Sequence, residues 1–125
     1  MKLRIKGNSI RIRVMRSELD SLRVGAPLDE SVRFGPDAAL RYTLAVADLD
    51  QPVSVSFAAD EIAIRISHAQ LASWRSEEQV GIYATLPVDA STDLEVAIEK
   101  DFACLDRTEN ENADAFPHPL VGATC

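Results

Sequence analysis

The chain has 125 residues, of which 46% are hydrophobic and 26% charged, and its formal net charge is −7. These values are typical of one soluble globular domain, residues 1–125, which buries about two-thirds of the surface of its unfolded chain. No apolar run approaches the ~20 residues that span a bilayer, so the sequence predicts no membrane partner. The overall acidity argues against a nucleic-acid partner, because such proteins usually carry a basic domain.

Residues 2–14 have the pattern of a β-hairpin. Apolar residues alternate with basic ones at the period of two that is typical of a strand. The alternation is interrupted at Gly7 and Asn8, which both tolerate the positive φ of a two-residue turn. A turn at that place pairs Arg4 with Arg11, leaving one face of the hairpin apolar and the other basic, so the register is fixed.

After the hairpin the sequence predicts a short helix and two more strands. Ser17 is placed to cap the free N–H groups at the start of the helix, and Gly25 is placed to end it. Strands are expected at residues 28–34 and 39–47, because a turn-forming segment separates them.

The same order of elements recurs after a shift of 52 residues without a gap, with Ser67 capping a second helix and strands at about 80–86 and 93–101. The sequence therefore predicts a ββαββ unit used twice, over about residues 2–47 and 54–99. The matched apolar pairs include Leu3 with Val55, Ile12 with Ile64, Leu22 with Trp74, Leu44 with Val96, and Val46 with Ile98.

Eight strands in hairpins, with two helices at equivalent places, predict an α+β fold. Neither half can bury its apolar sheet face alone. The expected solution is a continuous antiparallel sheet that is strongly curved or closed into a barrel. Two packed four-stranded sheets are the alternative.

Three sequence segments resemble a family of small bacterial proteins of unknown function. They are MKLRIKGNSIRIR (residues 1–13), EKDFACL (residues 99–105) and FPHP (residues 116–119). The resemblance covers nearly the whole chain. It implies a bacterial, cytoplasmic protein, and it supplies no activity, cofactor or catalytic residue.

The basic face of the first hairpin is a candidate binding site for an anion. Arg4, Arg11 and Arg13 project from this face, and directly opposed like charges destabilise a sheet. One interpretation is that phosphate, RNA or an acidic peptide neutralises them. The other is that the acidic face of the strand at 93–101 lies beside them, bringing Glu95, Glu99 or Asp101 within ion-pair distance.

The segment at residues 102–125 has no counterpart in the first repeat. Its apolar residues Phe102, Leu105 and Phe116 are expected to pack against the sheet. The segment then serves either as a strap over a sheet edge or as one wall of a pocket. The candidate polar groups of such a pocket are Cys104, Arg107 and Asp114. A disordered tail is the third alternative.

No motif for catalysis or cofactor binding is present, and the spacing of Cys104, His118 and Cys125 matches no zinc site, so we expect neither cofactor nor metal. Because no signal peptide is predicted, both cysteines are expected as thiols in the cytoplasm. The sequence favours a non-catalytic binding or interaction module whose partner is a protein or a small anionic ligand. The alternative is a small enzyme or anionic-ligand binder with its site under the C-terminal segment.

Overall fold

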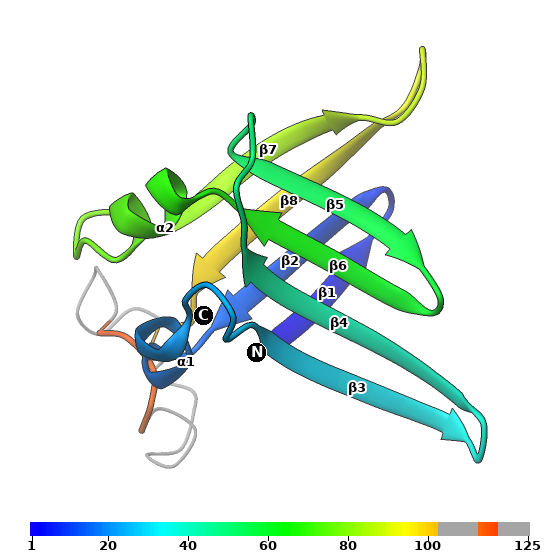
Figure 1. The fold of residues 1–125 in the computed structure, drawn as a ribbon, viewed down its shortest axis with the longest axis horizontal. Coiled ribbons are helices and arrows are strands. Elements are labelled where there is room, and N and C mark those ends of the chain that lie inside the picture. The colour runs from blue at the N-terminus through cyan, green and yellow to red at the C-terminus, as the bar shows by residue number, and fades with distance from the viewer. Residues whose placement is uncertain (103–112, 118–125) are drawn as a thin grey trace.

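The computed structural model describes residues 1–102 and 113–117. In this part of the chain the order strand, strand, helix, strand, strand occurs twice (Figure 1). The elements are β1 (Lys2–Lys6), β2 (Ser9–Val14), α1 (Arg16–Ser21), β3 (Leu28–Gly35), β4 (Ala38–Val46), β5 (Val53–Ala58), β6 (Glu61–Ile66), α2 (His68–Trp74), β7 (Gly81–Pro87) and β8 (Asp93–Lys100).

The strands form two four-stranded sheets, ordered β1-β2-β8-β7 and β3-β4-β6-β5. Figure 1 shows the strands of one sheet running across those of the other, with both helices at one end. The α+β class is confirmed, and the two-sheet alternative is the one found. The expected barrel is wrong because neither sheet closes, and the central pairs β2·β8 and β4·β6 are parallel. Parallel pairs arise because each helix carries the chain from one sheet to the other, so hairpins from different halves meet.

The predicted hairpin registers are confirmed. Arg4 lies opposite Arg11 across the first turn, where Gly7 has a φ of +55°. The hairpin of β5 and β6 turns at Ala59 and Asp60. Their φ values of 51° and 60° fit a two-residue turn of the kind that matches the twist of the strands. Local alternation and the 52-residue shift were therefore sufficient to place the first hairpin of each half.

The duplication fits the two sheets, since exchanging the halves converts one strand order into the other. The gapless shift is nevertheless wrong beyond the helices. Ile12 pairs with Ile98, and its repeat equivalent Ile64 pairs with Leu44. Leu44 is therefore equivalent to Ile98, a shift of 54 residues, and not to Val96. Leu28 pairs with Leu44 as Ile82 pairs with Ile98, so the third strands are also related by 54 residues and the two additional residues of the second repeat lie between its second strand and its third.

One hydrophobic cluster lies between the sheets and receives side chains from both of them and from both helices. Its central residues are branched aliphatic side chains of the inner strands. The side chains with no exposed surface are Ile12, Val14, Leu22, Leu44, Ile64, Ile66, Trp74 and Ile98.

Helix α2 begins as predicted and brings the single tryptophan into the core. The hydroxyl oxygen of Ser67 accepts a hydrogen bond from the backbone N–H of Gln70 at 3.2 Å. Trp74 is fully buried, and its indole N–H donates to the carbonyl of Val80 at 3.2 Å. A buried tryptophan needs such a partner, because an unpaired N–H in the core is costly.

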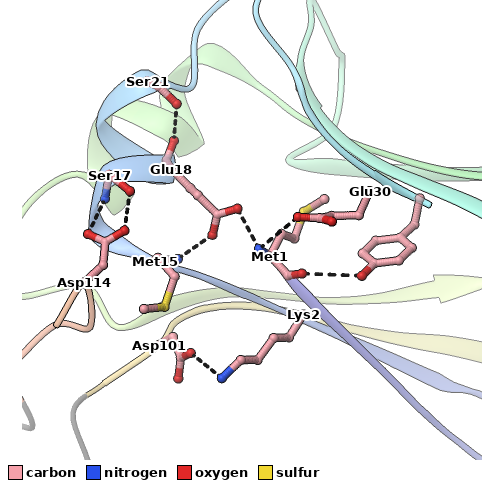
Figure 2. Close-up of polar contacts among 10 residues, drawn as sticks. Met1, Lys2, Met15, Ser17, Glu18, Ser21, Glu30, Asp101 and Asp114 are labelled. Atoms are coloured by element: carbon pink, nitrogen blue, oxygen red, sulfur yellow. Dashed lines mark hydrogen bonds and ion pairs between the residues drawn. The ribbon is translucent and has the colours of Figure 1, made fainter. Parts of the chain in front are cut away.

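Helix α1 begins differently from the prediction. The residue that precedes it is Met15, whose N–H donates to Glu18 Oε1 at 2.9 Å (Figure 2). The other oxygen of the same carboxylate contacts the α-ammonium group of Met1 at 2.6 Å. Ser17 does not cap the helix, and instead hydrogen-bonds through its N–H and hydroxyl to Asp114. One glutamate thus ties the first strand to the first helix.

The C-terminal segment contacts the fold through an aromatic pair. Phe102 and Phe116 form a parallel bridge, and their rings meet edge to face with centroids 6.1 Å apart. Phe116 packs against the core cluster, with Lys100 Nζ 5.3 Å and Arg16 Cζ 5.6 Å from its ring centroid. The third predicted anchor, Leu105, lies outside the described residues.

We expect Ile12→Ala to lower the free energy of unfolding by about 2–5 kcal/mol, the usual cost of truncating a fully buried aliphatic side chain. The matched control is Ile5→Ala, because Ile5 lies on the same face of the same hairpin and is 58% exposed. Urea unfolding measures both variants. Equal losses would contradict the placement of the core.

Candidate anion-binding groove

A hollow of about 480 Å³ lies over the outer face of the first sheet. All four strands of that sheet contribute to its walls. The lining residues are Arg4 and Lys6 of β1, Ser9, Ile10 and Arg11 of β2, Tyr83, Ala84 and Thr85 of β7, and Glu95, Val96 and Ala97 of β8.

The sheet register arranges the outward side chains in rows across the four strands. The central row is Arg4, Arg11, Ala97 and Tyr83. Ala97 has only a methyl group, so the middle of this row is low, while Arg11 and Tyr83 stand on either side. The row of Lys6, Ser9, Glu95 and Thr85 lies next to it, towards the hairpin turn.

The charges in the groove are predominantly positive. Its lining contains three cationic side chains and one carboxylate, although the whole chain has a net charge of −7. Arg4 and Lys6 are exposed, and neither forms an ion pair with any described residue. Two cations therefore remain available for a ligand from solution.

Glu99 forms ion pairs with the other two arginines of this face, Arg11 and Arg13. Its Oε1 lies 3.1 Å from Arg11 Nε and 3.8 Å from Arg13 Nε. The prediction that the acidic strand lies beside the basic hairpin is therefore confirmed, with β8 directly adjacent to β2. Arg11 contacts Glu99 through Nε, lines the groove and keeps 41% of its side chain exposed.

Tyr83 forms one wall of the groove and is held by the same glutamate. Its hydroxyl donates to Glu99 Oε2 at 2.7 Å, although 61% of the residue is exposed. Desolvation of the hydroxyl end, followed by the hydrogen bond and charge of Glu99, raises the pKa of Tyr83 to about 12. The close approach of β7 and the Tyr83 hydroxyl to β8 requires a glycine at position 81. A Cβ there would lie 2.7 Å from the carbonyl of Ile98 and 3.1 Å from the Tyr83 hydroxyl.

The structure brings two of the predicted site residues together in the groove. Arg4 and Arg11 both line it, and Arg13 lies one row beyond, beside Glu99. Asp101 was expected on the outer face with the other acids, but it is only 1% exposed and pairs with Lys2 at 3.0 Å. The chain leaves the sheet after Lys100, so the alternation no longer applies.

The remaining candidates do not join this groove. Asp114 accepts hydrogen bonds from Ser17 at the start of α1, on the helix end of the molecule (Figure 2). Cys104 and Arg107 lie outside the described residues. A pocket under the C-terminal segment therefore stays a prediction.

Sequence reasoning missed Tyr83, Ala97 and Gly81 as parts of the site. The alternation of residues 81–87 places Tyr83 on the outer face, so that signal was present. No local pattern indicates that β8 pairs with β2, and this pairing alone brings the ring close to the arginines.

A second hollow of about 470 Å³ lies between the segment joining the halves and the start of α2. Here His68 Nε2 lies 2.9 Å from Asp48 Oδ1, and both side chains are largely exposed. Among the described residues no group of three or more histidine, cysteine, aspartate or glutamate side chains is arranged to hold a metal ion.

The fold is thus an α+β assembly of two open, mixed sheets with a polar groove on one outer face. The chain belongs to a family of unknown function, DUF7009, whose pattern matches residues 1–120. No curated protein and no solved structure matches it. In the part of the chain that the structure describes, no helix is long and apolar enough to cross a membrane.

We expect Glu99→Gln to lower the pKa of Tyr83 from about 12 towards the ordinary value of about 10. The raised pKa means that the contribution of Tyr83 to stability is fully present below about pH 10 and is lost as the pH rises through about 12. Absorbance titration of tyrosinate measures the pKa of Tyr83. The Tyr42→Phe variant is the background for this titration, because the chain has two tyrosines. An unchanged titration would show that Glu99 does not hold the hydroxyl.

We expect Gly81→Ala to destabilise the fold by about 1–3 kcal/mol, because the added methyl group meets backbone that cannot move freely. Gly35→Ala is the control, since a Cβ there meets only Ala38 Cβ at 3.9 Å. Thermal unfolding compares the two. If both variants melt alike, the close approach at position 81 is wrong.

Proposed function

We propose that this protein is a non-catalytic binding module that holds a small anionic ligand, one bearing phosphate or carboxylate groups, in the groove on the outer face of β1-β2-β8-β7. The observation that carries the proposal is the pair of exposed cations, Arg4 and Lys6, that have no partner among the described residues. They line a concave surface whose charge is opposite to that of the whole chain.

The opposed arginines favour an anion between them. Arg4 and Arg11 are directly opposite in the register, so their like charges repel in the empty groove. An anion that accepts hydrogen bonds from both guanidinium groups removes this repulsion and gains charge-assisted hydrogen bonds. The planar fork of arginine fits carboxylate and phosphate oxygens, while Lys6 adds a point charge.

The rest of the groove favours a small ligand over a long polyanion. The Tyr83 ring provides an apolar wall, and Thr85 donates its hydroxyl to Glu95 at 2.9 Å, which keeps that carboxylate at the far edge. A long polyanion extending past this edge would meet the carboxylate of Glu95. A compact ligand that combines an anionic end with an apolar or ring-shaped end contacts both walls.

We expect inorganic pyrophosphate and citrate to shift the amide NMR signals of the groove strands at low salt. Arg4→Ala should weaken binding about ten- to a hundredfold, since a lost charge-assisted hydrogen bond costs ~1.5–3 kcal/mol. Arg23→Ala is the matched control, because Arg23 is exposed and lies outside the groove. Binding should weaken as salt is raised.

Two results would contradict the proposal. One is the absence of shifts in β1, β2 and β7 with either anion at low salt. The other is an equal loss of affinity in Arg4→Ala and Arg23→Ala, which would show that the anions respond to general charge and not to the groove.

A further inference from the structure

Strand β3 is the longest edge strand of either sheet. It has eight residues, against five in β1, six in β5 and seven in β7. Every residue of β3 between its two half-buried ends is exposed. Within the described chain no strand pairs with its outer edge, so a row of backbone hydrogen-bonding groups faces solvent.

Two of the other three edges, β1 and β7, are better protected against pairing with themselves, while β5 has no charged residue that could set a register. The outer face of β1 carries only lysine and arginine, so two copies side by side would place cations against cations. Strand β7 ends in Pro87, which has no N–H to donate. Strand β3 contains neither proline nor lysine.

The sequence of β3 is complementary to itself. A two-fold axis perpendicular to a sheet pairs antiparallel strands so that residues of the same face lie opposite each other. With Ser31 on the axis, Asp29 lies opposite Arg33 of the second copy, and Arg33 lies opposite its Asp29. Two ion pairs of opposite charge then flank the axis on the outer face, and Glu30 lies opposite Val32 on the inner face.

Other registers lack this complementarity. With Glu30 on the axis, two glutamates oppose each other. With Val32 on the axis, Asp29 lies opposite Gly35, and Arg33 opposite Ser31. The register about Ser31 is therefore the favoured one. It uses residues 29–33, the part of the β3·β4 ladder that precedes the irregularity between Arg33 and Gly35.

Asp29 and Arg33 both lie on the exposed edge strand, and each already has one partner within its own chain. Arg41 of the neighbouring strand bonds Asp29 Oδ2 through Nε at 3.0 Å, which lowers the pKa of Asp29 and keeps its carboxylate charged on the outer face. Arg33 donates to the carbonyl of Pro36 at 3.1 Å, so its guanidinium group lies at the turn, where the second strand would begin. Val32 is 42% exposed and Phe34 is 72% exposed, and a second strand would cover apolar surface at this edge.

We infer that two copies of this chain associate through β3, antiparallel about Ser31, to form a continuous eight-stranded sheet held by two Asp29–Arg33 ion pairs. The outer-face groove lies on the other sheet and remains open in both copies. Strand addition supplies the main-chain hydrogen bonds, and the crossed charges set the register.

A charge exchange tests the register. A contact of two short strands belongs to the small, weak class of interface, so sedimentation velocity should cover about 10 µM to 1 mM. We expect the unaltered protein to dimerise in this range, and Arg33→Asp and Asp29→Arg each to remain monomeric. An equimolar mixture of the two variants should form a heterodimer, because both crossed pairs again have opposite charges. A monomeric unaltered protein at the highest concentration, or a mixture that stays monomeric, overturns the inference.

Crosslinking locates the contact independently of charge. In a background of Cys104→Ser and Cys125→Ser, Ser31→Cys should oxidise rapidly to a covalent dimer, since residues directly opposite across strands have Cβ atoms about 4.5–5.5 Å apart. Ser56→Cys on the β5 edge is the matched control and should stay monomeric. Faster crosslinking of Ser56→Cys would place the interface at β5 and overturn the inference.

Discussion

The parallel pairing of β2 with β8 is the interaction on which the rest of the structure depends. Six consecutive residue pairs, from Ser9 with Glu95 to Val14 with Lys100, join a hairpin of the first half to a hairpin of the second. On the inner face this ladder sets Ile12 beside Ile98 in the core. On the outer face the same ladder sets Arg11 beside a small alanine, which creates the groove. Stability and binding surface thus come from one register, and a slip by one residue would exchange the two faces.

Two carboxylates, Glu99 and Glu18, each contact groups from two different segments of the chain. The outer face brings four cations of the hairpin into direct opposition, and Glu99 relieves part of that repulsion while it also positions Tyr83. At the helix end, Glu18 accepts from the N–H of Met15 and contacts the ammonium group of Met1. Each carboxylate has two oxygens engaged by different elements, so each joins segments that the sheet ladders alone leave separate.

Structure could be predicted from the sequence wherever a signal was local. Turn residues and alternation predicted the first hairpin of each half, β1 with β2 and β5 with β6, and Ser67 predicted the start of the second helix. Pairings between hairpins left no such signal, because period-two patterns are compatible with either parallel or antiparallel neighbours. For this reason Arg4 and Arg11 were identified as a basic face, whereas Tyr83 across the sheet was not. Lys100 shows the same limit: it occupies an inward position that a valine holds in the first half, and its ammonium group reaches the carbonyl of Ser76 at 2.7 Å.

The exchange of hairpins between halves bears on how such a fold can originate. Each half contributes one hairpin to each sheet, and each of those hairpins lies next to a hairpin of the other half. A single half-length chain would therefore leave the inner edge of both hairpins open and half of each sheet missing. Two such chains would complete both sheets if the hairpins of one chain paired with the hairpins of the other. Joining the two halves in one chain makes this pairing independent of protein concentration and lets each half carry a different charge on the shared sheet, arginine on β2 and glutamate on β8.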